Sequence, residues 1–244
     1  SQHTEGLVDA GVELVRSAAR LAGERTVVGD DVEVEADHVV IATGAGAVIP
    51  DVPGTDLDGV WTSEDLLTSD TLPERLVIVG GGPVGSELGQ VYARFGSDVT
   101  VCDLADRLHG DTEPEIAELL VETLERSGVT VRLGVELTGI ETADEGLTAR
   151  FGDDPAETAD RIVLAVGTEP RVDHIGLETV TDDDFNLDGE GRVNGLDWLW
   201  AVGDVTGRSH WTHGATYQAR RLAASLLGEA WIDPDLIMPD AVFT

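Results

Sequence analysis

Residues 75–103, RLVIVGGGPVGSELGQVYARFGSDVTVCD, decide the fold class. The apolar run at 76–79 has the length of a buried parallel strand, and the run GGGPVG that follows it fits the pattern G-x-G-x-x-G. Apolar residues then recur at helical spacing up to Gly96, and a second strand-like run ends at Asp103, about twenty residues after the glycines. This order of strand, glycine turn, helix, strand and acid predicts a βαβ unit that binds a dinucleotide.

Each position of this motif has a chemical role. Gly80 allows a tight turn, Gly82 lets the backbone approach a pyrophosphate, and Gly85 lets the helix pack close to the strand. Asp103 is expected to accept hydrogen bonds from the adenosine ribose, and its charge should repel a 2′-phosphate, which favours NAD over NADP. The nearby basic residue Arg107 leaves NADP as the less favoured alternative.

The composition argues against several classes of partner. The chain has 244 residues, with 48 acidic side chains against 15 basic ones, all of them arginine, and a net charge of -33. This charge disfavours nucleic acid or an anionic membrane surface as a partner. A solvated acidic shell, as in proteins adapted to high salt, accounts for it. Self-repulsion is then expected to loosen the fold where salt does not screen the charges.

Cysteine usage and hydropathy indicate the compartment. Cys102 is the only cysteine, so no disulfide can form within the chain and a reducing compartment is expected. Its place in a strand-like run predicts a buried thiol rather than a reactive one. No apolar segment is long enough to cross a membrane, and the first residues have no signal-peptide character, which predicts a cytoplasmic location.

Three further apolar runs end in glycine, at 38–42, 161–166 and 198–202. Open α/β sheets bind their ligands at the carboxyl ends of such strands, so the residues after these runs are candidate ligand contacts. They are Thr43 and Gly44 after the first run, Gly167 after the second, and Gly203 with Asp204 after the third.

The remaining segments are interpreted as scaffold. Thr112 and Glu115 have capping-box spacing ahead of a predicted helix. Its expected apolar face is formed by Ile116, Leu119, Leu120 and Leu124. Residues 129–151 are expected to form antiparallel or edge strands. The acidic segment at 181–191 matches no EF-hand spacing, so a solvated turn is favoured over a cation site, and no metal is predicted.

The ordered segments VVIATG, LVIVGGGPVGSELG, RIVLAVGTEP, WLWAVGDVTG and THGATYQARRLAA resemble the pyridine nucleotide-disulfide oxidoreductases, the flavoprotein family of dihydrolipoamide dehydrogenase and mercuric reductase. The resemblance implies an α/β fold with two Rossmann-like domains, in which an NAD(P) domain is inserted into a truncated FAD domain. A dimerisation domain follows in the family. The implied boundaries are 1–61 and 173–233 for the FAD domain, 62–172 for the NAD(P) domain and 234–244 for the start of the interface domain.

The resemblance also implies roles for individual residues. Those implied to contact FAD are Thr43, Gly44, Gly203, Asp204, Thr212 and His213. Asp204 would accept hydrogen bonds from the ribityl hydroxyls, and a turn or cap role is its alternative. The helix that begins near Thr212 would direct its N-terminus at the flavin and stabilise negative charge there.

Two more residues are matched to the nicotinamide end of NAD. Glu87 matches the acidic residue that orients the nicotinamide for hydride transfer in the family, and a first-turn helix carboxylate without that role is the alternative. Gly167 matches the glycine that lies beside the bound nicotinamide nucleotide. Both assignments rest on the resemblance.

Several features depart from the family pattern. No G-x-G-x-x-G precedes residue 77, and the C-x-x-x-x-C redox pair of the family is absent. Thr168 and Arg171 replace the arginine and asparagine that follow AVG in the family. The chain is therefore interpreted as an internal fragment that lacks the redox cysteines and the His-Glu pair and is expected to hold flavin weakly or not at all.

The expected function is that of a flavoprotein oxidoreductase core in which NADH passes a hydride to FAD. In the intact protein, a homodimer by resemblance, the electrons would continue to a disulfide or another acceptor, either a small molecule or a protein. Two alternatives stay open. One is a flavin-free nicotinamide dehydrogenase, which the absence of lysine disfavours, and the other is a non-catalytic dinucleotide-binding module.

Overall fold

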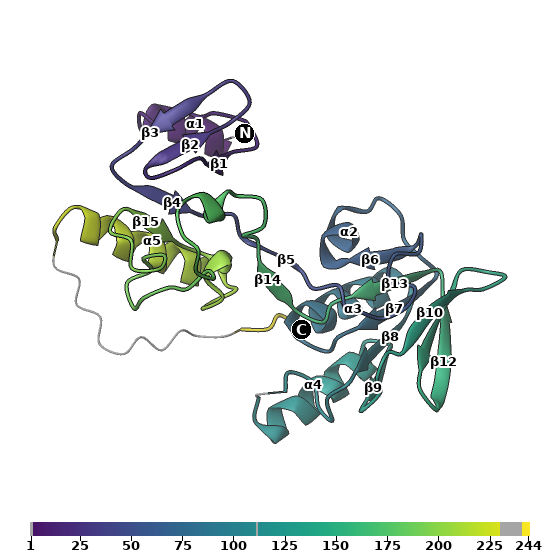
Figure 1. Cartoon of the computed structure of the whole chain (residues 1–244). Coiled ribbons are helices and arrows are strands. Elements are labelled where there is room, and N and C mark those ends of the chain that lie inside the picture. Colours follow the sequence, from purple (N-terminus) through teal and green to yellow (C-terminus); the bar gives the residue numbers. More distant parts are fainter. Residues whose placement is uncertain (1, 111, 230–240) are drawn as a thin grey trace. The chain divides into compact units, whose positions relative to one another are not determined.

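The computed structural model describes residues 2–110, 112–229 and 241–244, which form two compact units (Figure 1). Unit 1 is drawn from Ser1–Ala45 and Pro170–Met238, and unit 2 from Gly46–Glu169 and Pro239–Thr244. Residues 46–61, which the family resemblance assigned to the FAD domain, lie in unit 2. No helix among the described residues is long and apolar enough to cross a membrane.

Unit 2 is built on a parallel five-stranded sheet of order β6-β13-β7-β8-β9. Its strands are β6 (Val60–Thr62), β7 (Arg75–Val79), β8 (Asp98–Asp103), β9 (Val129–Leu133) and β13 (Arg161–Leu164). The helix α3 (Pro83–Phe95) connects β7 to β8, and α4 (Pro114–Arg126) connects β8 to β9. The predicted α/β class and the βαβ unit at 75–103 are confirmed.

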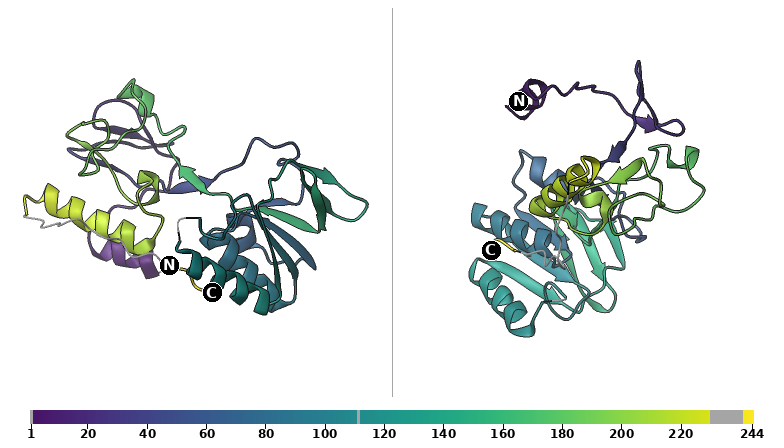
Figure 2. Two further views of the ribbon diagram at one scale, coloured as in Figure 1. Left: turned by 90° about the horizontal axis from the view of Figure 1, so that it is seen from below. Right: turned by 90° about the vertical axis from the view of Figure 1, so that its left-hand side faces the viewer.

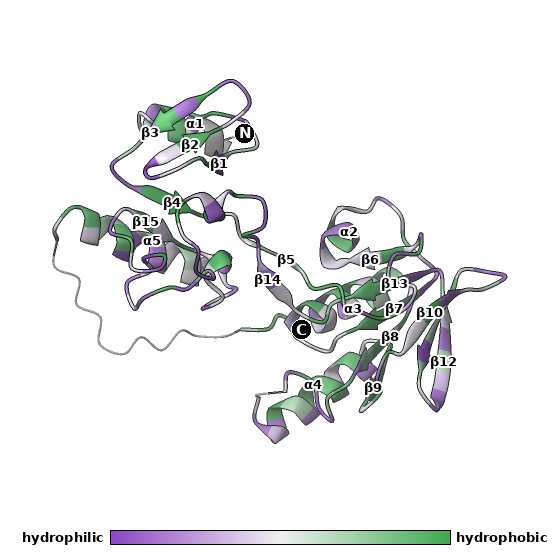
Figure 3. Ribbon diagram, viewed as in Figure 1, coloured by the Kyte–Doolittle hydropathy of each residue, from purple (hydrophilic) through white to green (hydrophobic). Residues whose placement is uncertain are grey.

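The two faces of this sheet bury alternate side chains of β7. Val77 and Val79 belong to a cluster that includes Phe151, whereas Leu76 and Ile78 belong to a second cluster on the side of α3 and α4. These four side chains are at most 7% exposed. An unbroken apolar run is therefore needed here, because a parallel strand covered on both faces buries every residue. Figure 3 shows this run as hydrophobic along β7.

A three-stranded antiparallel meander covers the face of the sheet away from the two helices (Figure 2). Its strands are β10 (Gly139–Thr142), β11 (Leu147–Phe151) and β12 (Asp154–Ala159). The prediction of antiparallel or edge strands at 129–151 is confirmed, since β9 is the parallel edge strand and β10 and β11 pair antiparallel.

The predicted capping box at the start of α4 is wrong. The N-cap is Glu113, and no side chain caps this helix. Pro114 explains the shift, because its fixed φ and missing N–H suit the first helical position. The apolar face is also rotated from the predicted one, since Ile116 is 54% exposed whereas Ala117 is 2% exposed. The residues of α4 that are buried or packed against the core are Ala117, Leu120, Val121 and Leu124.

A complete capping box occurs instead at the start of α2 (Ser63–Thr68). The Asp65 N–H donates to Thr62 Oγ1 at 3.4 Å, and the Thr62 N–H donates to Asp65 Oδ2 at 2.8 Å. The backbone N–H of Thr62, followed by its hydroxyl, lowers the pKa of Asp65. The sequence signal was present, but Asp replaces the more usual Glu or Gln at the third position.

Replacing Thr62 with alanine is expected to lower the free energy of unfolding by about 1 kcal/mol, a typical cost for losing a cap. Because the pKa of Asp65 is lower in the folded state, its contribution is present above the ordinary value of 3.8 and is lost as the pH falls through the folded pKa. Urea unfolding at neutral pH measures the loss. Thr68→Ala is the matched control, since the Thr68 hydroxyl donates to backbone carbonyls of the same helix, Glu64 O at 2.8 Å and Asp65 O at 3.5 Å, and to neither side chain of the capping box. An equal loss in both variants would contradict a specific capping role.

Unit 1 contains a short parallel strand pair and an antiparallel three-stranded sheet. Its core includes Leu21, Ile41, Trp198 and Leu199. The elements are α1 (Gln2–Asp9), β1 (Arg20–Leu21), β2 (Thr26–Val28), β3 (Glu33–Glu35), β4 (Val39–Ile41), the short helices η1 (Leu177–Thr179) and η2 (Asp204–Thr206), β15 (Leu199–Ala201) and α5 (Thr212–Leu226). The short strands β5 (Ala45–Ala47) and β14 (Thr168–Pro170) pair with each other.

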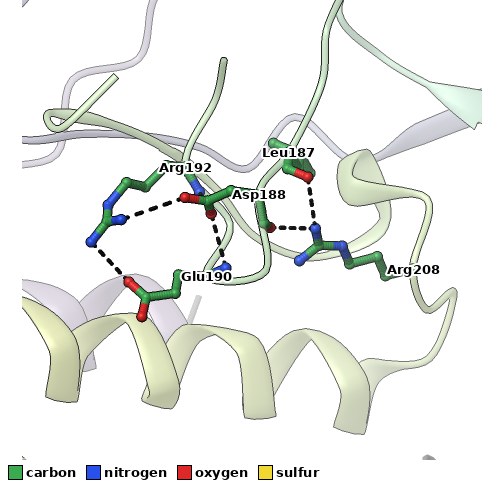
Figure 4. A network of polar contacts seen from close by, with 5 residues as sticks. All are labelled: Leu187, Asp188, Glu190, Arg192 and Arg208. Carbon is green, nitrogen blue, oxygen red and sulfur yellow. Dashed lines mark hydrogen bonds and ion pairs between the residues drawn. The ribbon is translucent and has the colours of Figure 1, made fainter. Parts of the chain in front are cut away.

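The acidic segment of unit 1 contains a turn at Asp188 that is held by backbone N–H groups and by two arginines outside the segment, Arg192 and Arg208 (Figure 4). Asp188 Oδ1 accepts the N–H groups of Glu190 and Arg192, both at 2.9 Å, and Arg208 donates to the Leu187 and Asp188 carbonyls. Burial alone would raise the pKa of Asp188, but these N–H groups and the Arg192 charge outweigh it and lower the pKa. Among the residues that the structure describes, no three acidic, histidine or cysteine side chains gather as a metal site requires.

Candidate dinucleotide-binding sites

The carboxyl ends of neighbouring parallel strands meet at the glycine-rich turn of unit 2. In the register of β13, β7 and β8, Leu164, Val79 and Cys102 lie side by side. The residues that follow share this edge, as the hydrogen bond from Gly80 N to Cys102 O at 2.8 Å shows. The structure thus brings the segments that carry Gly80, Asp103 and Gly167 to one edge of the sheet, where such folds bind ligands.

The glycines of the turn differ in what surrounds them. Gly80 has φ +115°, and a Cβ there would collide with the Ala165 carbonyl. A Cβ at Gly85 would collide with the Gly80 carbonyl, whereas a Cβ at Gly82 would meet no atom within 4 Å. Gly80 and Gly85 are therefore required by the chain itself. Gly82 leaves open space in front of the backbone, which is the space that a pyrophosphate needs.

The helix α3 begins with unused donors. Its N-cap is Gly82, no side chain caps it, and its first turn contains no acid. The Ser86 N–H donates to Gly82 O at 3.0 Å, and the N–H groups before it in the helix have no acceptor inside the helix. Together with the partial positive charge of the helix N-terminus, these donors suit an anion.

Asp103 is held rigidly at the end of β8. Its Oδ2 accepts the N–H of Gly81, and its Oδ1 accepts the N–H of Ala105 at 2.7 Å. The carboxylate therefore ties the glycine-rich turn to the neighbouring strand and stands at the sheet edge with a fixed orientation. Arg107, the basic residue that kept NADP as an alternative cofactor, forms an ion pair with Asp106 at 3.6 Å, and its side chain is 41% exposed.

A second edge of the same kind occurs in unit 1. The parallel strands β4 and β15 pair Ile41 with Ala201, and the N–H of Val202 donates to Ile41 O at 3.0 Å. The predicted FAD contacts lie just beyond both strands, with one residue between: Thr43 and Gly44 after β4, and Gly203 and Asp204 after β15.

The start of α5 completes this edge. A Cβ at Gly203 would lie 3.6 Å from Ala215 Cβ, so the first turn of α5 packs against Gly203. Thr212 and His213 are the first residues of α5, which has no side-chain cap and no acid in its first turn. The ring of His213 stacks on Trp211 with centroids 6.2 Å apart. The residues predicted from the resemblance are thus grouped at the end of one strand pair.

Residues 1–219 match the family model described as pyridine nucleotide-disulphide oxidoreductase. The chain belongs to this family. As a member of the pyridine nucleotide-disulphide oxidoreductases, it has an α/β fold with a parallel sheet, as the structure shows. The resemblance inferred from the sequence motifs is confirmed.

Curated relatives and solved structures agree with the family match. The chain is 32% identical to a dihydrolipoyl dehydrogenase of Haloferax volcanii, covering 96% of this chain and 53% of that protein. It is 30% identical to a glutathione reductase of Burkholderia cepacia, covering 90% and 49%. The flavoprotein disulfide reductase RclA of Escherichia coli superimposes with a TM-score of 0.86 at 26% identity, covering 93% and 54%. The chain thus spans about half the length of the relatives it matches.

Unit 1 of this family member fits part of a flavin site. Gly44 and Gly203 have φ of +75° and +81°, and a Cβ at Gly44 would meet no atom within 4 Å, so other atoms of the chain leave the space beside Gly44 open. The uncapped start of α5 could offer its N–H groups to the flavin ring. A glycine fingerprint for the FAD pyrophosphate is not among these residues.

Two residues that fix the backbone at Gly203 were missed from the sequence. Gln218 Oε1 accepts the Gly203 N–H at 2.7 Å, and the Thr206 hydroxyl donates to Gly203 O at 2.7 Å. Gln218 Nε2 lies 3.3 Å from Thr206 Oγ1, so the two side chains contact each other as well as the backbone of Gly203. An isolated Gln on a helix carries no sequence signal for this role.

The structure places Glu87 on α3, where its carboxylate accepts the N–H of Phe243 at 2.9 Å. This side chain is therefore already engaged by the backbone of unit 2. Its predicted role at the nicotinamide remains a proposal. Cys102 is fully buried in β8, and burial raises the pKa of its thiol to about 12, as expected for an unreactive cysteine.

Proposed function

We propose that this chain is the dinucleotide-binding core of an FAD-dependent oxidoreductase that takes a hydride from NADH. Unit 2 binds NADH and unit 1 contributes to the FAD site. The observation that carries the proposal is the turn of unit 2, where open space at Gly82 lies beside the uncapped N-terminus of α3 and the fixed carboxylate of Asp103. The open space and the N-terminus of α3 suit the pyrophosphate of NADH, and the carboxylate suits its ribose hydroxyls.

Different residues bind different parts of NADH. The backbone N–H groups at the start of α3 bind the pyrophosphate, and Asp103 accepts hydrogen bonds from the hydroxyls of the adenosine ribose. Glu87, with the segment after β13 that carries Gly167, orients the nicotinamide. When bound in unit 1, FAD would accept the hydride and pass electrons on. Thr43, Gly44, Gly203 and Asp204 hold it, and the start of α5 with Thr212 and His213 stabilises negative charge on it.

The acceptor lies outside these residues. The names of the relatives support a disulfide acceptor in the intact protein, since they include a dihydrolipoyl dehydrogenase and a glutathione reductase. A homodimer is proposed on the same ground. The family's redox cysteine pair is not among these residues, because Cys102 is the only cysteine and is buried. Hydride transfer, rather than disulfide chemistry, is therefore the step to which this chain contributes.

Calorimetric titration of the purified chain is expected to show NADH binding and NADPH binding at least about tenfold weaker, since each 1.4 kcal/mol of charge repulsion corresponds to a factor of ten. Asp103→Asn removes the charge and keeps one of the two acceptor oxygens, so it should weaken NADH binding and narrow the difference between NADH and NADPH. Asp106→Asn is the matched control, because Asp106 is exposed and paired with Arg107. An absence of NADH binding would overturn the proposal, and equal affinities in the wild type would overturn the preference for NADH.

A further inference from the structure

The carbonyl of Gly81 accepts hydrogen bonds from two residues, His109 and Ser86, which also contact each other. The backbone N–H of His109 donates to Gly81 O at 3.2 Å. The His109 imidazole also lies beside this carbonyl's other partner, since its Nε2 is 3.2 Å from Ser86 Oγ, which itself lies 3.4 Å from Gly81 O. His109 therefore reaches the same carbonyl through its backbone and through Ser86.

The tautomer of His109 sets the direction of the bond between its ring and Ser86. When the Ser86 hydroxyl donates to Gly81 O, Ser86 Oγ accepts a hydrogen bond from a protonated His109 Nε2. Neutral imidazole with Nε2 protonated satisfies this chain, and so does imidazolium. The ring thus closes a loop from His109 through Ser86 to Gly81 and back to His109.

The backbone of His109 is itself unusual. Its φ is +51°, in the left-handed region that a residue other than glycine rarely adopts. Ser86 is fully buried in the first turns of α3. A strained residue whose side chain bonds to a buried hydroxyl indicates that tertiary structure fixes this conformation, and such residues gather at functional sites.

We propose that His109 is a positioning residue of the dinucleotide site. His109 fixes the carbonyl of Gly81, while Asp103 fixes its N–H. The peptide that carries the Gly81 carbonyl also carries the N–H of Gly82, which is thereby directed at the pyrophosphate. The inference rests on the proposed function of unit 2, because it concerns affinity for the phosphates of NADH. It adds two residues, His109 and Ser86, that do not themselves carry the glycine motif.

The test compares ligands that differ in their phosphates. His109→Gly removes the imidazole and suits the left-handed backbone, and Ser86→Ala breaks the same path at its other end. Each is expected to weaken NADH and ADP-ribose binding by about fivefold, as for the loss of one hydrogen bond, and to weaken AMP binding less. The double variant should lose no more than either single variant, since both act on one path. His109→Gln keeps a donor near the Nε2 position and should restore most of the affinity.

Controls separate this role from general loosening of the fold. Each variant should melt within about 4 °C of the wild type, the expected cost of one internal hydrogen bond in a chain of this size. His174→Gly is the matched control, because His174 also has a left-handed φ, of +61°, but lies in unit 1. Additive losses in the double variant, or equal weakening of AMP and ADP-ribose, would overturn the inference while leaving the proposed function standing. Wild-type protein that fails to bind NADH or ADP-ribose would overturn both.

Discussion

Replacing Gly85 with alanine is expected to abolish measurable NADH binding and to destabilise unit 2 by about 3 kcal/mol, the upper range for overpacking a rigid site. The added Cβ would collide with the Gly80 carbonyl, which is backbone and cannot move aside as a side chain can. Either α3 or the turn must shift. Because the same residues form the phosphate site, the shift removes binding as well as stability. Calorimetry with NADH and urea unfolding measure the two effects.

Gly82→Ala is the matched control, since it adds the same methyl group three residues away. A Cβ at Gly82 meets nothing within 4 Å, and its φ of -74° is ordinary for alanine, so stability should stay within about 0.5 kcal/mol of the wild type. NADH binding should nevertheless fall steeply, because the methyl group occupies the space proposed for the pyrophosphate. Retained NADH binding in Gly85→Ala, or full affinity in Gly82→Ala, would contradict this account of the turn.

The unit around these glycines was predictable because its signals are local. The apolar run of β7, the glycine turn, the helical spacing and the acid at the end of β8 all lie within residues 75–103. Right-handed crossover topology then leaves little freedom in how two such parallel strands pair. The strand edge in unit 1 could also be anticipated, although β4 and β15 are far apart in the chain, because each strand ends in the same glycine pattern.

The supports of the sites could not be predicted in this way. Asp103 was expected to face a ribose, and its bond to Gly81, which lies 22 residues away in the chain, emerges only when β7 and β8 are paired in register. Neither His109 nor Gln218 was assigned a role at a site from the sequence. Hydrogen bonds of this kind depend on tertiary distance and side-chain direction, for which spacing in one sequence gives no signal.

Raising the KCl concentration from about 0.1 M to about 2 M is expected to increase the melting temperature by about 10 °C, which for a chain of this size corresponds to roughly 3 kcal/mol. With 48 acidic and 15 basic residues, most carboxylates cannot have a basic partner. The described ion pairs engage few of them, among them Asp160 with Arg75 and Glu141 with Arg150. The rest repel one another more in the compact state than in the unfolded chain, and salt weakens this repulsion.

The control must separate screening of charge from exclusion of solute from the protein surface. Sucrose stabilises folded proteins by exclusion without screening charge, so at matched osmolality it should raise the melting temperature much less than KCl. Partial neutralisation at mildly acid pH should likewise reduce the effect of KCl. An equal response to sucrose and KCl would show that exclusion, rather than repulsion, governs stability. A melting temperature independent of KCl would show that the excess carboxylates are too far apart on the folded surface to matter, since exposed charges separated by more than the roughly 10 Å Debye length at 0.1 M salt interact little.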